Sequence, residues 1–256
     1  MKKIIRRISI VLLLGYVGMG VFLYIYQRDL LYFPTPGSPT AYQSMTIHNE
    51  GESINVIVLH EGHKNAILYF GGNGESMAQS ADYIAGQFPD FTVYLMDYRG
   101  YGQSTGESSE KALYSDALKL YDRVRPKHDR ISIGGRSLGT GISTYVAANR
   151  EVSKLALITP FDSIVNIAQG RYPIYPISLL LDDSYDSVSR VKQIKARTLI
   201  VIAELDRVVP KESTQKLIDA FDPEQLEVIV IKDRGHVDIS SDKRYYKIMQ
   251  AFIGEG

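Results

Sequence analysis

Residues 131–139 read Ile131-Ser132-Ile133-Gly134-Gly135-Arg136-Ser137-Leu138-Gly139. A strand-like apolar run leads into a Gly-x-Ser-x-Gly turn, and residues 138–149 continue with helical spacing. A serine in such a tight turn projects its oxygen above the sheet, and the flanking backbone passes so close to its neighbours that a Cβ would clash. The pattern predicts a nucleophile elbow with Ser137 as the attacking group. The alternative is a glycine-rich turn around a structural serine.

The chain around this elbow alternates strand signals with helix signals. Strand-like runs lie at residues 54–59, 66–70, 92–96, 131–134, 155–158, 198–202 and 226–231, and helical spacing occurs at 75–88, 110–123, 138–149, 212–221 and 243–253. Most of the strand-like runs are short and continuously apolar, as in parallel strands buried on both faces. The alternation predicts the α/β class, with a mostly parallel central sheet flanked by helices on both faces. The first runs lack a helix between them and are expected to form an antiparallel edge.

The interval 161–197 is too long for a simple crossover between two strands. We expect residues of about 162–197 to form a small cap over the carboxyl edge of the sheet, where ligands bind in open α/β folds. The alternative is an ordinary helix packed beside the sheet. Residues 172–181 are unusually apolar and aromatic. If they face the site, they provide a wall for an acyl chain; otherwise they only pack the cap onto the sheet.

The composition argues against several classes of function. The 256 residues include 29 basic and 29 acidic side chains, so no overall field favours nucleic acid. The chain has no cysteine, which excludes disulfides and thiolate catalysis. No two histidines stand four residues apart, and no carboxylate cluster has the spacing of metal ligands. We therefore expect neither a metal nor a cofactor.

The N-terminal residues have the pattern of a membrane anchor. Cations at positions 2, 3, 6 and 7 precede an apolar run over residues 8–26. At about 1.5 Å per residue, a helix of this run spans roughly 28 Å, close to the ~30 Å hydrocarbon core of a bilayer. We expect an uncleaved single-pass anchor over residues 1–28. Cationic flanks stay in the cytoplasm, so the catalytic domain is expected outside it.

Two further expectations concern the remainder of the chain. The alternative to an anchor is a cleaved signal peptide and a secreted protein, but no small-residue cleavage site follows the apolar run. The hydrolase domain is expected over residues 29–256. Its first stretch, 29–39, contains three prolines and a glycine, so we expect a linker without regular structure along the domain surface.

A serine hydroxyl needs a base to take its proton. His236 lies in a loop just after the last strand, at the sheet edge where the elbow is expected. The other histidines, at 48, 60, 63 and 128, are expected at the surface. The acid that orients the base should fall between the serine and the histidine, in a loop after a strand. Asp206 meets this rule in the loop after 198–202, and Glu204 in the same loop is the alternative.

Acyl transfer also needs donors for an oxyanion. The backbone N–H of Leu138, next after the nucleophile, is the expected first donor, and the loop after strand 66–70 should supply the second. That loop reads Gly-Gly-Asn-Gly at 71–74, and the backbone N–H of Asn73 is expected to donate. A phosphate-binding loop is the competing interpretation, but its Gly-Lys-Ser/Thr ending is absent. The glycine-rich segment 97–104 is, on physical grounds, only a tight turn.

These residues together resemble the α/β-hydrolase superfamily from about Leu31 onward. The chain is most similar to a membrane-anchored branch that includes the α/β-hydrolase domain-containing proteins 12, 13 and 17 and bacterial relatives. The resemblance rests on Leu-Leu-Tyr-Phe-Pro at 30–34, Asp-Tyr-Arg-Gly-Tyr-Gly-Gln-Ser at 97–104, and Pro-Phe at 160–161. The branch usually has His-Gly-Asn-x-Gly in its oxyanion loop, and Gly71 replaces that histidine here. The resemblance implies esterase, thioesterase, lysophospholipase or peptidase activity.

These observations predict a membrane-anchored serine hydrolase that cleaves a carboxylic ester or thioester through an acyl-enzyme. A lipid is among the candidate acyl substrates. Two other functions stay open: a peptidase of related fold, and a catalytically silent binding protein with this fold. The expected partners are the acyl substrate and the membrane, and no nucleic acid.

Overall fold

A computed structural model describes residues 1–254 of the chain. Within these residues, eight strands form one sheet in the order β1-β2-β4-β3-β5-β6-β7-β8. The strands are β1 (Gln43–Asn49), β2 (Glu52–Leu59), β3 (Asn65–Phe70), β4 (Thr92–Met96), β5 (Arg130–Arg136), β6 (Lys154–Ile158), β7 (Arg197–Ala203) and β8 (Leu226–Ile231). The helices are α1 (Lys2–Ile25), α2 (Gln27–Leu31), α3 (Met77–Gln87), α4 (Glu110–Val124), α5 (Leu138–Asn149), α6 (Ile164–Arg171), α7 (Ile177–Leu180), α8 (Lys211–Ala220) and α9 (Lys243–Gly254). Short 3₁₀ turns occur at Arg125–Lys127, Val188–Gln193 and Ile239–Ser241.

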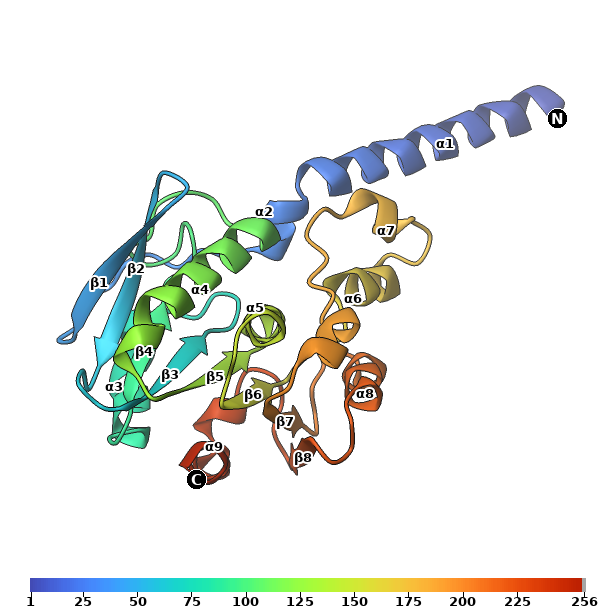
Figure 1. Cartoon of the computed structure of the whole chain (residues 1–256). Coiled ribbons are helices and arrows are strands. Elements are labelled where there is room, and N and C mark those ends of the chain that lie inside the picture. The colour runs from blue at the N-terminus through green and yellow to red at the C-terminus, as the bar shows by residue number, and fades with distance from the viewer. Residues whose placement is uncertain (255–256) are drawn as a thin grey trace.

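Helices cover both faces of the sheet (Figure 1). Strands β4, β3, β5, β6, β7 and β8 pair in parallel. Strands β1 and β2 are antiparallel to each other, and β2 is antiparallel to β4. On one face α4, α5 and α8 bury Leu113, Ile142 and Leu217, and on the other α3 and α9 bury Ile84 and Met249. The predicted α/β-hydrolase fold and its antiparallel edge are confirmed.

Most elements occur where the apolar periodicity predicts them, and β4, β8 and α5 have the predicted bounds. Strand β1 is not predicted, because Ile47 is its one fully buried residue and its other side chains form no apolar pattern. The expectation that residues 29–39 lack regular structure is wrong at its start. Helix α2 continues to Leu31, and the chain leaves the helix only before Pro34.

Helix α1 projects away from the domain (Figure 1). Its length and composition suffice to cross a membrane, with a mean hydropathy of 2.3 over its most apolar window, and 6% of that window is buried. The interval between β6 and β7, predicted as a cap, contains α6 and α7, and it lies beside the C-terminal half of α1. Helix α1 and the cap interval are therefore neighbours in space.

A buried ion pair ties the turn after β4 to α4. Nε and Nη2 of Arg99 each donate to the Asp116 carboxylate at 2.8 Å, and the two side chains are 9% and 0% exposed. A second pair of the same bidentate geometry joins Arg150 to Asp122 on the surface of α4, at 2.7 and 2.8 Å. There the exposed fractions of the side chains are 32% and 51%. The two pairs differ in burial, and the buried pair has further partners: Arg99 Nη2 also bonds Glu50 Oε2 at 3.0 Å, and Asn49 donates to Asp116 at 2.7 Å.

Asp116→Ala should lower the free energy of unfolding by about 3 kcal/mol, because it leaves the buried Arg99 charge with only the half-exposed Glu50 as a partner, at 3.0 Å. Asp122→Ala should lower it by at most about 1 kcal/mol, since water can solvate Arg150. Urea unfolding of both variants in detergent solution measures the two values. Equal losses would contradict the explanation from burial.

Candidate active site

Ser137 occupies the turn between β5 and α5 with φ +48° and ψ −117°. Residues with a side chain rarely adopt this conformation, so the turn is strained and is held by its surroundings. A Cβ added at Gly135 would overlap Ser143 and Gly139, and one added at Gly139 would overlap the Phe70 carbonyl. Close backbone packing therefore requires both flanking glycines, for the reason that the sequence pattern predicts.

Three of the predicted site residues meet above this turn. His236 Nε2 lies 2.8 Å from Ser137 Oγ, and His236 Nδ1 lies 2.7 Å from Asp206 Oδ2. Asp206 comes from the loop after β7 and His236 from the loop after β8, so both lie at the carboxyl edge of parallel strands. When Nδ1–H donates to the carboxylate, Nε2 can accept the serine proton. The arrangement can therefore activate the Ser137 hydroxyl.

Asp206 is held as a carboxylate. Its Oδ1 accepts the backbone N–H of Val208 at 2.8 Å and that of Val209 at 2.9 Å. Burial opposes ionisation of this group, but the hydrogen bonds from His236 and from these amides outweigh burial and hold the pKa of Asp206 below its ordinary value. Asp206 is therefore ionised at neutral pH and can orient the imidazole.

The alternative residues lie elsewhere. Glu204 Oε2 accepts the backbone N–H of Asp233 at 3.0 Å and braces the following loop. His128, expected at the surface, is buried: its Nε2 bonds the Tyr94 hydroxyl and its Nδ1 bonds the His63 carbonyl, each at 2.9 Å. Burial lowers the pKa of His128. The surface expectation is wrong for this residue. The charged residues that flank it in the sequence suggest an exposed position, but His128 itself is buried and hydrogen-bonded.

The loop after β3 approaches the elbow from the side. A Cβ added at Gly72 would lie 3.8 Å from Ser137 Cβ, so this loop lies against the serine. The Gly72 N–H donates to Glu75 Oε2 at 2.7 Å. In the described part of the chain, the backbone N–H groups of Asn73 and Leu138 donate to no protein atom. These two groups are the predicted oxyanion donors.

Two tyrosines hold this loop in place. Neither composition nor motif spacing predicts that they do so. The Tyr98 hydroxyl donates to the Gly71 carbonyl at 2.6 Å, and the Tyr101 hydroxyl donates to Asn73 Oδ1 at 2.6 Å. Both rings are buried, so the loop rests on rigid partners. They belong to segment 97–104, which physical reasoning treats only as a tight turn. The family resemblance of that segment was the signal that could have found them.

The Asn73 side chain also binds the backbone that follows α2. Its Nδ2 donates to the Leu31 carbonyl at 2.6 Å, and its Oδ1 accepts the N–H of Phe33 at 3.0 Å. The Phe33 N–H also reaches the Tyr101 hydroxyl at 2.9 Å. The segment between the anchor and the domain is therefore hydrogen-bonded to the predicted oxyanion loop.

Arg136 and Glu75 connect the three loops of the site. Arg136, next to the serine in the elbow, has Nη1 3.5 Å from Glu75 Oε2, and its Nη2 donates to the Val237 carbonyl at 2.9 Å. The same Glu75 oxygen accepts the Gly72 N–H. One ion pair thus links the elbow, the oxyanion loop and the loop of His236. Sequence reasoning missed it, because no local spacing pairs charges so far apart in the chain.

For the apolar residues of 172–181, the sequence leaves two roles open: a wall for an acyl chain, or packing of the cap onto the sheet. Tyr175 and Ile177 form a cluster with Leu23 of α1. Ile174 and Leu179 are exposed. The cap interval therefore presents much of its apolar surface to the anchor helix and outward, and neither outcome that the sequence suggested describes it fully.

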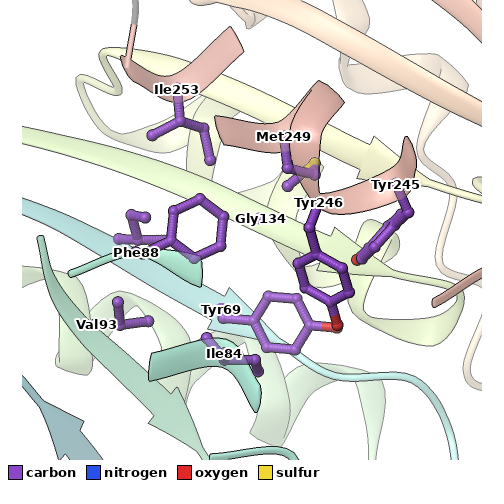
Figure 2. Close-up of a pocket in the computed structure, with 10 residues that line it drawn as sticks. Tyr69, Ile84, Phe88, Val93, Gly134, Tyr245, Tyr246, Met249 and Ile253 are labelled. Carbon is purple, nitrogen blue, oxygen red and sulfur yellow. The ribbon is translucent and has the colours of Figure 1, made fainter. Parts of the chain in front are cut away.

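A cavity of about 10 Å³ lies on the opposite face of the sheet from α5. Figure 2 shows Tyr69 of β3 facing Tyr246 and Met249 of α9 across it. Such a volume holds about one water molecule, and its lining includes none of the three residues that meet above the elbow. Among residues 1–254, no group of three or more histidine or carboxylate side chains is arranged to hold a metal ion.

Asp206→Asn should lower kcat by roughly 10⁴-fold, because asparagine no longer holds the required histidine tautomer. Glu204→Gln should change kcat little, since a glutamine oxygen can still accept the Asp233 N–H. Steady-state kinetics with a soluble chromogenic ester measures both effects. The reverse ranking would reassign the acid to Glu204.

Comparisons with known proteins agree with this architecture. The sequence profile of the alpha/beta hydrolase fold matches residues 65–179. The chain is 28% identical over 254 residues to an uncharacterized protein of Mycobacterium tuberculosis, across 91% of this chain and 89% of that protein. It is 27% identical over 200 residues to alpha/beta hydrolase domain-containing protein 17B of Xenopus laevis, across 75% of this chain and 67% of that protein.

A solved esterase of Pyrococcus furiosus has the same fold. It superposes with a TM-score of 0.69 over 87% of this chain and 98% of that chain, at 16% sequence identity. Identity this low supports the fold and says nothing of the substrate. Profile, relatives and sheet topology agree: the chain has the α/β-hydrolase fold and is related to the α/β-hydrolase domain-containing proteins that its sequence resembles.

Proposed function

We propose that this protein is a membrane-anchored serine hydrolase that cleaves a carboxylic ester or a thioester. The observation that carries the proposal is the unbroken hydrogen-bonded series from Ser137 through His236 to Asp206, with contacts of 2.8 and 2.7 Å. A hydroxyl in contact with a base, which a third group orients, is the arrangement that makes serine a nucleophile. The strained turn at Ser137 supports the same role, because such strain concentrates at functional sites.

The reaction follows from these contacts. His236 Nε2 takes the Ser137 proton as Oγ attacks the substrate carbonyl, and the N–H groups of Asn73 and Leu138 hold the resulting oxyanion. Collapse of this intermediate breaks the ester or thioester bond, and His236 gives the proton to the leaving oxygen or sulfur. The acyl group stays on Ser137. Water then attacks it, with His236 again as base, and releases the carboxylic acid; Asp206 stabilises the imidazolium in both steps.

Ser137→Ala should reduce ester hydrolysis to the residual rate that substrate binding and the oxyanion donors provide. It should also abolish covalent labelling by a fluorophosphonate probe, which reacts with an activated serine. Ser189→Ala is the matched control, because Ser189 is exposed in the cap interval and lies outside the site. Near-normal turnover by purified Ser137→Ala protein would refute the nucleophile.

The membrane part of the proposal rests on α1. This helix of 24 residues leaves most of its apolar side chains exposed, and such a surface is unstable in water. Its length suits a bilayer, and the cations at positions 2, 3, 6 and 7 favour a cytoplasmic N-terminus. The hydrolase domain then lies outside the cytoplasm, close to lipid. Acyl esters of lipids are therefore the substrates that we would test first.

A protease added to intact cells with a permeable outer envelope should digest the hydrolase domain, because the anchor places it outside the cytoplasm. A cytoplasmic marker protein serves as the control and should survive. Immunoblots of domain and marker measure the outcome. Protection of the domain until the cells are lysed would reverse the orientation, and loss of residues 1–26 from the mature chain would replace the anchor by a signal peptide.

A further inference from the structure

We propose that residues 172–181, here called the cap tip, insert into the lipid bilayer beside α1, in the leaflet on the side of the hydrolase domain. The inference rests on the proposed anchor and goes beyond it, because an anchor alone would leave the cap in water. Three features of the cap tip carry it: the contacts with α1, the partners of its backbone polar groups, and the side chains that it exposes.

The cap tip packs against α1 well away from the end of the helix. The Tyr175 ring stacks on Tyr16, with ring centroids 4.7 Å apart and planes 5° apart. The two hydroxyl groups are used reciprocally. Tyr16 donates to the Ile174 carbonyl at 2.9 Å, and Tyr175 donates to the Tyr16 carbonyl at 3.2 Å. These contacts join the cap tip to one position on the anchor helix.

The position of Tyr16 sets the depth. It lies near the middle of the apolar run 8–26, roughly 15 Å along the helix from Tyr26 at 1.5 Å per residue. The hydrocarbon core of a bilayer is about 30 Å thick, so a spanning α1 places Tyr16 near its centre. A residue stacked on Tyr16 then lies in the hydrocarbon. The Tyr175 ring also lies against Gly20, four residues further along α1. The cap tip therefore contacts α1 at more than one level.

Several backbone polar groups of the cap tip have partners within the protein, which a segment in lipid needs because lipid offers no hydrogen bonds. The N–H groups of Ile174 and Ser178 are exceptions, with no partner among residues 1–254. Pro173 and Pro176 have no N–H to satisfy. Gln169 of α6 donates to the Tyr172 carbonyl at 3.4 Å and to the Pro173 carbonyl at 3.3 Å. Its side-chain oxygen accepts the Ile177 N–H at 3.2 Å. One neutral side chain thus serves three backbone groups.

A second glutamine performs this role at the other end of the cap tip. Gln27 Nε2 donates to the Leu180 carbonyl at 3.2 Å, and its Oε1 accepts the Asp182 N–H at 2.7 Å. Gln27 is itself buried between α1 and the cap interval. No charged residue occurs within 172–181, whereas Arg171 and Asp182 flank it directly. The charges therefore mark the two points where the segment would cross the lipid interface.

Most of the side chains that the cap tip turns outward are apolar, and Ser178 is the exposed polar one. Leu179 is 81% exposed and Ile174 is 67% exposed. The adjoining part of α1 exposes Val17 and Val21 to about half their area. The cap interval lies beside α1 (Figure 1), so the exposed apolar side chains of the two segments are neighbours, and the bilayer that accommodates α1 is the partner that fits both.

The absence of tryptophan from this sequence allows a direct test with single tryptophans. The full chain is reconstituted in phosphatidylcholine vesicles whose acyl chains carry bromine either near the headgroup or deep in the core. Ile174→Trp and Leu179→Trp report on the cap tip. Val228→Trp is the matched control, because Val228 is an exposed apolar residue on β8, far from α1 in Figure 1.

The emission of both cap-tip variants should shift to shorter wavelength and be quenched by brominated lipid. Ile174→Trp should respond more to deep bromine, since its neighbour Tyr16 lies mid-span. Leu179→Trp should respond more to shallow bromine, because the adjacent Leu180 contacts Gln27 at the end of the span. Val228→Trp should keep a water-like emission that bromine does not change.

Vesicle flotation separates failure of this inference from failure of the anchor. If the chain floats with the vesicles but both cap-tip variants emit like Val228→Trp, the cap tip lies in water and the inference is overturned while the anchor stands. If the chain does not float, both are overturned. Equal quenching of all three variants would indicate unspecific adsorption of the domain and would likewise overturn the inference.

Discussion

The close approach of α5 to β3 is the constraint on which the rest of the site depends. At Gly139 the helix backbone passes so near the Phe70 carbonyl that no side chain fits between them. This contact draws the first turn of α5 onto the sheet and forces Ser137 to the left-handed φ of +48°. Strain of about 1–3 kcal/mol is typical of such a conformation. The burial of α5 side chains such as Ile142 and Val146 offsets it.

Hydrogen bonds rather than packing hold the remaining loops against this turn. Tyr98 and Tyr101 support the oxyanion loop from below, and the Glu75–Arg136 pair ties that loop to the one that carries His236. Donors that are fixed in advance need no reorganisation when charge develops on a substrate, and this preorganisation is the main source of electrostatic catalysis. If Ser137 is the nucleophile, as proposed, the polar groups around it contribute to the reaction rate, whereas the glycines set the shape of the turn.

The sequence predicts best what depends on local pattern. The apolar runs of β4 and β8 and the glycine spacing around Ser137 lie within short windows. The acid and the histidine lie 30 and 99 positions from their partners, and they were predictable only because the fold sets their chain order and places them in loops after strands. Distant contacts that no such rule covers are beyond this reasoning. Tyr16 and Tyr175 are 159 positions apart, and no sequence pattern near either residue predicts that they are in contact. The same limit explains why His128 was expected at the surface and why the pairing of Glu75 with Arg136 was missed.

If Ser137 is the nucleophile and α1 the anchor, as proposed, the carboxamide of Asn73 joins the stretch behind the anchor to the catalytic centre. It holds the backbone at Leu31 and Phe33, and it belongs to the residue whose own N–H is proposed to receive the oxyanion. A form of the enzyme shed from the membrane by a cut beyond Phe33 would lose both partners. It would keep Ser137, His236 and Asp206 yet carry a looser oxyanion loop, so release from the lipid surface and loss of catalytic power would accompany each other.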